Sequence, residues 1–219
     1  MVKPYYSDDY VQIFHGDCQE ILPTLPRVDL VLTDPPYGES THKNHLSKVT
    51  SHQDLGFNCI GSDDMVFLSN QMLAISRAWV IFTCDWHFMH ELEHLVRFGI
   101  WIKPNGSPQF TGDRPGMGWE PVAILHKTGK KTWNGGGKHA VWNYPKTEGL
   151  HPTQKPLRLY KQWIMDFSKE GDSVCDPFMG SGTTAVAAKQ LNRKCIGIEI
   201  EEKYCEIAAQ RCSQEVLAL

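Results

Sequence analysis

Short, nearly continuous runs of apolar residues recur along this chain, and longer polar stretches separate them. Such runs are typical of strands buried on both faces of a parallel β-sheet, because neither side of the strand needs polar side chains. They therefore predict a largely parallel sheet. The predicted strands are residues 11–14, 28–33, 79–83, 100–103, 121–126, 173–177 and 194–200.

Between several of these runs the apolar residues follow a helical spacing. Asp63 and Asp64 stand before the sequence MVFLSNQMLAISRA, where they fit an N-cap and a first helical turn. The alternation of strands and helices predicts an α/β fold with a Rossmann-like, doubly wound sheet. The predicted helices are residues 18–25, 63–77, 86–98, 156–169, 182–191 and 201–216.

Composition narrows the class of protein. The chain has 219 residues, 41% of them hydrophobic and 21% charged, which is typical of one globular domain covering residues 1–219. Its longest apolar runs are far shorter than the ~20 residues of a membrane span, and its start does not resemble a secretory signal. Seven cysteines without a CxxC pair favour reduced thiols. We therefore expect a single cytoplasmic domain that does not enter a membrane.

Positive charge is concentrated in one stretch of a chain whose net charge is −3. Residues 127–161 contain a single acidic residue, Glu148. A local basic stripe can bind phosphates although the whole protein is acidic, and a solvated lysine-rich loop explains the same pattern equally well. The basic residues of this stretch are Lys127, Lys130, Lys131, Lys138, Lys146, Lys155, Arg158 and Lys161.

The sequence SVCDPFMGSGTTAVAA, residues 173–188, joins a predicted strand to a predicted helix through a glycine turn. Gly180, Gly182 and Ala185 match the pattern G-x-G-x-x-A. Glu199 lies 19 residues after Gly180, at the end of the next predicted strand. This arrangement is that of a dinucleotide-binding site, so a nicotinamide or flavin enzyme is one alternative, and a tight turn without any ligand is another.

Asp176 distinguishes between these cofactors. It ends the predicted strand at the mouth of the glycine turn, where a pyrophosphate would meet an uncompensated carboxylate. A ligand that carries a cationic amine and a sulfonium is favoured at that position by its charge. Glu199 can accept hydrogen bonds from ribose hydroxyls in either case. The two acidic residues therefore favour S-adenosylmethionine over a dinucleotide.

The sequence TDPPYG, residues 33–38, follows another predicted strand and combines two prolines with an acid and an aromatic ring. Each proline fixes its own φ angle and restricts the residue before it, so the segment is stiff. The Asp34 carboxylate and the Pro35 carbonyl, followed by Pro36, can accept the two N–H groups of an exocyclic amine and orient its lone pair. Tyr37 can stack on a base that has left the duplex. A rigid proline turn is the simpler alternative.

Five motifs in this order resemble the DNA amino-methyltransferases of the permuted (beta) group, in which DPPY precedes the glycine motif. The motifs are HGDC (15–18), TDPPYG (33–38), HPTQKPLRL (151–159), DPFMGSGTT (176–184) and GIEIEEKYCEIAAQR (197–211). The resemblance implies a catalytic Asp34-Pro35-Pro36-Tyr37 segment. It also implies an S-adenosylmethionine site made by Asp17, Cys18, Asp34, Thr153, Lys155, Asp176, Pro177, Phe178, Gly180, Ser181, Gly182, Thr183, Glu199 and Ile200.

The resemblance further implies a seven-stranded sheet, mostly parallel, in which residues 121–126 form the one antiparallel strand. It implies double-stranded DNA as the substrate, within restriction-modification, and N6 of a flipped-out adenine as the methylated atom. N4 of cytosine is the alternative, and RNA or protein amines are more distant ones. Relatives are often dimers, so a homodimer is expected. A nuclease partner is not specified by the sequence.

The chain departs from these relatives where a sizeable target-recognition region is usual. Only the strip 128–150 is available, and we expect it to contact DNA phosphates through Lys130, Lys131 and Lys138, with Trp133 or Trp142 against a sugar or base. The loop 38–58 is interpreted as a lid over the flipped base and the cofactor. Its DNA-contacting residues would be Lys43, His45 and Lys48.

The sequence HELEH at 90–94 matches H-E-x-x-H, the motif of zinc hydrolases, within a segment predicted to be helical. A catalytic zinc needs a third protein ligand, which His87 could supply one turn earlier. Because such a short match arises easily by chance, we interpret His90 and His94 as surface or interface residues and expect no metal.

Overall fold

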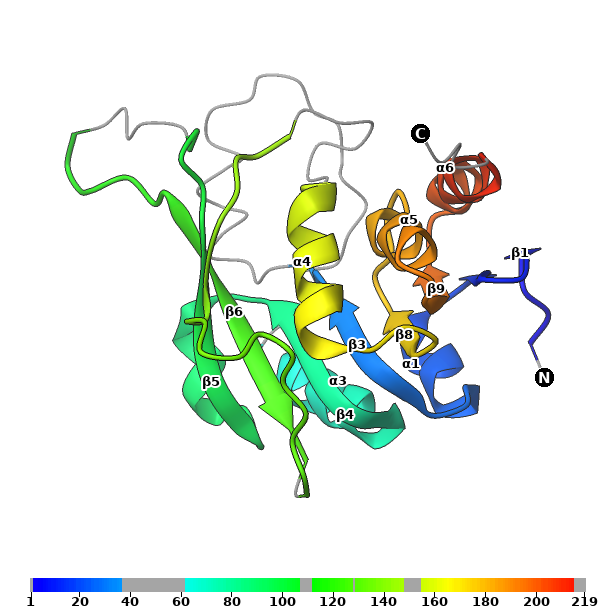
Figure 1. Cartoon of the computed structure of the whole chain (residues 1–219), viewed down its shortest axis with the longest axis horizontal. Helices are drawn as coiled ribbons and strands as arrows, with labels where there is room; N and C mark the ends of the chain where they lie inside the picture. The colour runs from blue at the N-terminus through cyan, green and yellow to red at the C-terminus, as the bar shows by residue number, and fades with distance from the viewer. Residues whose placement is uncertain (1, 37–61, 107–111, 128, 148–154, 215–219) are drawn as a thin grey trace.

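A computed structural model describes residues 2–36, 62–106, 112–127, 129–147 and 155–214 of the chain. Its centre is a nine-stranded sheet in the order β1-β2-β9-β8-β3-β4-β6-β5-β7 (Figure 1). The strands are β1 (Tyr6–Ser7), β2 (Val11–His15), β3 (Val28–Thr33), β4 (Ser76–Thr83), β5 (Leu95–Ile102), β6 (Trp119–His126), β7 (Val141–Asn143), β8 (Ser173–Asp176) and β9 (Lys194–Glu199).

The α/β class is confirmed, but the predicted strand number is wrong. The sheet has nine strands rather than seven, because the short strands β1 and β7 extend its two edges. Strand β6 is antiparallel to both of its neighbours, as expected for residues 121–126. Strand β1 is antiparallel to β2 as well, so the expectation of one antiparallel strand is also corrected.

Helices cover both faces of the sheet, as a doubly wound fold requires. In Figure 1, α4, α5 and α6 lie in front of the sheet, while α1 and α3 lie behind it. Two clusters of buried apolar side chains fill the space on either face. The helices are α1 (Cys18–Ile21), α3 (Ser62–Ile75), α4 (Leu157–Phe167), α5 (Thr183–Gln190) and α6 (Glu202–Ser213), with 3₁₀ turns η1 (Leu22–Thr24) and η2 (Trp86–Glu91).

The predicted helix at 86–98 is wrong. Residues 86–91 form the 3₁₀ turn η2, and strand β5 begins at Leu95. Between them His94 has a φ of 60°, a left-handed conformation that ends any helix. The following residues pair with β6, so long-range strand pairing overrides the local helical spacing.

The order of the strands determines where a ligand can bind. The chain leaves β3 for β4 on one side, while β8 occupies the other side of β3. In open α/β sheets, ligands bind at the carboxyl ends of the strands next to such a change of direction. Asp34, Asp176 and Glu199 all lie at that carboxyl edge. Within the described segments, no helix is long and apolar enough to cross a membrane.

Candidate active site

Asp34 directly follows β3 and is the first charged group of the site. Its Oδ1 accepts a hydrogen bond from the hydroxyl of Thr83, the last residue of β4. The Nζ atom of Lys155 lies 3.0 Å from the same oxygen. Burial raises the pKa of Asp34, while the positive charge of Lys155 opposes that shift. The next residue, Pro35, is buried.

Lys155 connects Asp34 to a second carboxylate, that of Glu120 at the start of β6. The Lys155 Nζ atom lies 2.7 Å from Oε2 of Glu120, and the Nζ atom of Lys103 lies 2.7 Å from Oε1. Burial alone would raise the pKa of Glu120, but Lys155 and Lys103 lower it to about 2. Burial alone would lower the pKa of Lys155, yet Asp34 and Glu120 raise it above its ordinary value. Glu120 and Lys155 are therefore both charged near neutral pH.

Sequence reasoning missed Glu120 and Lys103. Both lie at the carboxyl edge because β6 runs antiparallel, so its first residues lie beside the last residues of β4 and β5. The available signal was the antiparallel direction expected for residues 121–126, which places the residue before them at the same edge as Asp34.

The glycine turn between β8 and α5 forms as the motif predicts. Gly180 and Gly182 have φ angles of 53° and 84°, which disfavour residues with a Cβ. A Cβ on Gly182 would lie 2.8 Å from the Cβ of Ala208, so only glycine allows α5 to approach α6 this closely. A Cβ on Gly180 would meet no described atom within 4 Å. The turn therefore presents backbone to open space at Gly180.

Asp176 ends β8 as expected, but its carboxylate is enclosed by the protein. Its carboxylate is buried and accepts hydrogen bonds from the hydroxyl of Thr33 at 2.6 Å, the hydroxyl of Thr184 and the amide of Phe178 at 3.1 Å. Burial raises its pKa to about 6, against the effect of these hydrogen bonds. Asp176 therefore ties β3 to the glycine turn rather than presenting an exposed carboxylate at its mouth.

Glu199 joins the glycine turn to the end of β9. Its Oε2 accepts a hydrogen bond from the amide of Gly180 at 2.8 Å, and its Oε1 accepts one from the amide of Glu201 at 2.8 Å. Burial raises the pKa of Glu199, and the backbone amides oppose that shift. The Gly16 amide donates to the Glu199 carbonyl at 3.0 Å, which holds the HGDC turn beside the same edge.

The other predicted cofactor residues surround this edge. Asp17 is exposed and caps α1 through the Gln19 amide at 2.8 Å, whereas Cys18 is buried, which raises its pKa to about 12. Ser181 accepts hydrogen bonds from Arg211 at 2.5 and 3.1 Å. The remaining residues of the turn are Pro177, Phe178 and Thr183, and Ile200 is exposed just after β9. Tyr37, Lys43, His45, Lys48 and Thr153, together with the loop 38–58, lie outside the described residues.

Three lysines of the strip 128–150, Lys130, Lys131 and Lys138, are not brought to this edge. Strand β6 ends at His126 beside Trp79, near the start of β4, so the strip begins at the opposite edge of the sheet. The carbonyl of Thr132 accepts a hydrogen bond from the Trp79 indole at 2.5 Å, which holds Lys130 and Lys131 there. Lys138 lies 3.3 Å from Asp166, near the end of α4.

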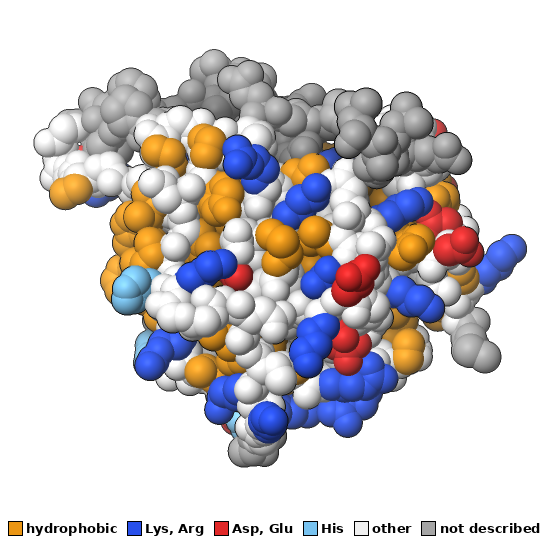
Figure 2. Space-filling model, in the orientation of Figure 1, with side chains coloured by type: hydrophobic (Ala, Val, Ile, Leu, Met, Phe, Trp, Pro, Cys, Tyr) orange, Lys and Arg blue, Asp and Glu red, His pale blue; other side chains and the backbone are white. Residues whose placement is uncertain are grey.

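The tryptophans of the same strip pack into the protein. The ring of Trp133 lies 4.8 Å from that of Phe167, and its indole donates to the Gly136 carbonyl at 2.8 Å. Trp142 is buried against Trp163. Figure 2 shows basic side chains spread over the face that α4 covers, with acidic ones among them, rather than gathered into one patch.

The HELEH sequence does not form the helix that a zinc hydrolase site needs. His90 belongs to η2, and His94 has left-handed backbone just before β5. Two imidazoles therefore do not share the face of one α-helix. Within the described ranges, no group of three or more His, Cys, Asp or Glu side chains could hold a metal ion.

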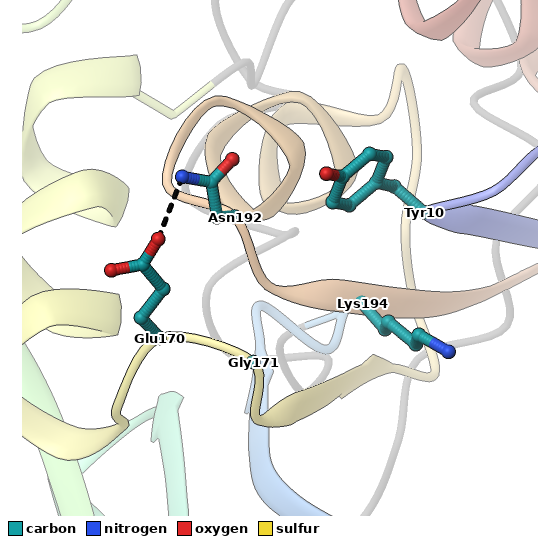
Figure 3. Close-up of a pocket in the computed structure, with 5 residues that line it drawn as sticks. All are labelled: Tyr10, Glu170, Gly171, Asn192 and Lys194. Atoms are coloured by element: carbon teal, nitrogen blue, oxygen red, sulfur yellow. Dashed lines mark hydrogen bonds between the residues drawn. The ribbon is translucent and has the colours of Figure 1, made fainter.

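A pocket at the opposite edge of the sheet is separate from this site. Tyr10, Glu170, Gly171, Asn192 and Lys194 line it (Figure 3). Gly171 and Lys194 stand at the starts of β8 and β9, whereas Asp176 and Glu199 stand at the ends of these strands. The Asn192 amide donates to Glu170 at 2.8 Å across one side of the pocket.

Comparison with known proteins identifies the family. The model of the N6_N4_Mtase family, described as DNA methylase, matches residues 28–210. The chain belongs to this family. The matched range includes the TDPPYG segment, Lys103, Glu120, Lys155 and the glycine turn.

Individual relatives span almost the whole chain. It is 28% identical to the Type II methyltransferase M2.DpnII of Streptococcus pneumoniae, over 98% of this chain and 94% of the relative. It is 30% identical to the Type II methyltransferase M.HinfI of Haemophilus influenzae, over 96% of this chain and 70% of the relative.

Solved structures agree with this assignment. The complex of M1.HpyAVI with SAM is 26% identical, has a TM-score of 0.69, and the match covers 92% of this chain and 99% of that one. The cytosine-N4-specific PvuII DNA methyltransferase has a TM-score of 0.74 at 17% identity, and the match covers 99% of this chain and 91% of that one. This likeness shows the shared fold.

Proposed function

We propose that this chain transfers the methyl group of S-adenosylmethionine to the exocyclic amine of a base in double-stranded DNA. The observation that carries this proposal is the position of Asp34 at the end of β3, beside the glycine turn, in a member of the DNA methylase family. The relatives M2.DpnII and M.HinfI are Type II methyltransferases, which supports a role in restriction-modification.

The residues at the carboxyl edge fit S-adenosylmethionine. The backbone at Gly180 borders open space beside Glu199, whose carboxylate can accept hydrogen bonds from ribose hydroxyls. Asp17 and Ile200 are exposed next to the same strand ends, where an adenine ring could lie. When bound, the cofactor supplies an electrophilic methyl group on a positively charged sulfur.

Asp34 and Pro35 would orient the amine that attacks this methyl group. The Asp34 carboxylate accepts one N–H, and the Pro35 carbonyl accepts the other, so that the nitrogen lone pair is released from conjugation with the ring. Two acceptors at a fixed angle also stabilise the positive charge that develops on the nitrogen. Tyr37 is proposed to stack on the flipped base.

N6 of adenine is the proposed target. In the relatives that the sequence resembles, an aspartate in the first position of the motif is commoner among enzymes that act on adenine, and a serine among those that act on cytosine. Asp34 therefore favours adenine. N4 of cytosine, which needs the same two acceptors, is the alternative target.

The reaction can be tested with tritiated S-adenosylmethionine and unmethylated DNA, followed by digestion to nucleosides and chromatography. We expect label in N6-methyladenine, and a loss of more than about a hundredfold in the Asp34→Asn variant, which keeps the side-chain shape but removes the charge. Asp64→Asn on the exposed start of α3 is the matched control and should retain activity. Label in N4-methylcytosine would exclude adenine, and label only in RNA or protein would exclude DNA.

A further inference from the structure

Four charged side chains, those of Asp34, Lys103, Glu120 and Lys155, form a charged cluster. Glu120 lies at its centre and contacts both lysines. Each of its carboxylate oxygens is 2.7 Å from one ammonium group, that of Lys103 or that of Lys155. The Glu120 and Lys155 side chains are only 17% and 10% exposed, so water screens these contacts weakly. Lys155 in turn lies 3.0 Å from Asp34.

Trp101 fixes the positions of both lysines. It is paired with Glu120 across β5 and β6, and its indole donates to the Tyr144 carbonyl at 2.8 Å. The Nζ atoms of Lys103 and Lys155 lie 5.3 and 5.4 Å from the centre of its ring. Attraction between an ammonium group and the face of an indole adds to the ion pairs. The cluster is therefore held together before any substrate binds.

We propose that Glu120 is a positioning residue for methyl transfer, which holds Lys155 between two carboxylates and so preserves the negative charge that Asp34 presents to the amine. The inference rests on the proposed function, because it assigns a role within that same site. Glu120 acts through Lys155, and no contact between Glu120 and the substrate is required.

The argument follows from the charge of the cluster. Within the part of the chain that the structure describes, the formal charges of the two lysines and two carboxylates sum to zero, so no excess of positive charge opposes a sulfonium that enters the site beside Asp34. During transfer the C–S bond breaks and the sulfur keeps the electron pair, while the lone pair of the amine nitrogen forms the new C–N bond. The nitrogen then carries a positive charge until its proton passes to water. Without the negative charge of Glu120, the cluster would carry one excess positive charge. That charge would lie beside the sulfonium of the cofactor and beside the cation that develops on the amine nitrogen. Weakly screened charges of equal sign disfavour such a transition state.

Three variants test this role: Glu120→Gln, Lys103→Met and the double variant. For Glu120→Gln we expect kcat to fall roughly 10- to 100-fold, the range seen when the partner behind a metal ligand is removed, while the KM for DNA stays unchanged. Lys103→Met removes an equally short ion pair but no negative charge, so kcat should fall about tenfold less. The double variant restores a neutral cluster and should recover most of the kcat lost in Glu120→Gln.

A purely structural role of Glu120 gives the opposite order. Two broken ion pairs would then make the double variant as slow as Glu120→Gln or slower, and that result would overturn the inference. An active wild-type protein with unchanged kcat in Glu120→Gln would overturn it too, while leaving the proposed function intact. A wild-type protein that methylates no DNA would overturn both. Thermal melting above the assay temperature confirms that the variants compared are folded.

Discussion

The ammonium group of Lys155 lies 3.0 Å from Oδ1 of Asp34 and joins the segment just before α4 to the residue after β3. A second carboxylate, that of Glu120, lies 2.7 Å from the same ammonium group. The positive charge of Lys155 is therefore paired with two carboxylates. The Asp34 carboxylate, which we propose to be catalytic, is therefore oriented by groups that are already in place. Such an arrangement requires little reorganisation when charge develops on the substrate.

Replacing Lys155 by methionine should destabilise the protein and slow the reaction. The variant leaves the largely buried carboxylates of Asp34 and Glu120 without the cation between them, and breaking a buried ion pair in this way costs about 3–5 kcal/mol. We expect this loss in urea unfolding at neutral pH. The control Lys130→Met replaces an exposed lysine at the opposite edge and should change stability by less than about 0.5 kcal/mol. Equal effects of the two variants would contradict the importance of the cluster.

Asp176 should make the free energy of unfolding depend on pH. Burial raises its pKa from 3.8 to about 6 in the folded protein. Between these two pH values the folded state binds more protons than the unfolded state, so the free energy of unfolding falls as pH rises through this window. The fall attributable to this group is on the order of 3 kcal/mol and is complete above the folded pKa.

The Asp176→Asn variant isolates this contribution. An asparagine can keep the hydrogen bonds with Thr33, Thr184 and Phe178 but cannot ionise. Urea unfolding at about pH 4 and about pH 7 should therefore show a larger loss for the wild type than for the variant. Parallel curves for the two proteins would show that Asp176 titrates at an ordinary pKa when folded.

Strands were the part of the fold that the sequence revealed best. Runs such as residues 28–33 are apolar on both sides because both faces of β3 are covered, and this property is local. The pairing of β5 with β6 is not local, and there the helical spacing of residues 86–98 was misleading. The two short edge strands β1 and β7 have too few residues for any pattern to identify them.

The site was predicted in part for the same reason. Asp34, Gly180 and Glu199 follow strands that the sequence marks clearly, so their meeting at one edge follows from parallel topology. Glu120 lies at the start of its strand rather than at the end, and only the antiparallel direction of β6 brings it to the edge that carries Asp34. Asp176 was expected to face a ligand, but threonine hydroxyls from β3 and α5 donate hydrogen bonds to it. These contacts join separate elements, so no local sequence pattern predicts them.

The two glycines of the turn should respond differently to alanine. Gly182→Ala introduces left-handed strain and a contact of 2.8 Å with Ala208, so we expect a loss of about 2–4 kcal/mol in the free energy of unfolding. Gly180→Ala introduces strain without a collision, which should cost about 1–2 kcal/mol. Its methyl group would occupy the space proposed for the cofactor, so binding of S-adenosylmethionine should weaken more than stability does. Calorimetric titration and urea unfolding measure the two effects, and unaltered affinity in Gly180→Ala would contradict the assigned cofactor position.

Two sets of basic residues should differ in their effect on DNA binding. Lys130, Lys131 and Lys138 lie at the edge of the sheet opposite Asp34, so their joint replacement by alanine should leave the affinity for duplex DNA within about threefold and its salt dependence unchanged. Lys146 and Arg114 are exposed at the carboxyl edge instead. The Lys146 amide donates to Asn105 at 2.7 Å, just beyond β5, and the segment containing Arg114 leads into the start of β6.

Replacement of Lys146 and Arg114 by alanine should therefore weaken binding at low salt and reduce the slope of log K against log salt by about 1–2. Fluorescence anisotropy with a labelled duplex at several salt concentrations distinguishes the two variants. If the triple lysine variant shows the larger change in slope, DNA contacts the opposite edge as well. The strip 128–150 would then contact DNA phosphates, as the sequence predicts. If only the Lys146 and Arg114 variant changes, the duplex is confined to the edge that carries Asp34 and Glu199, which is the geometry that a flipped base requires.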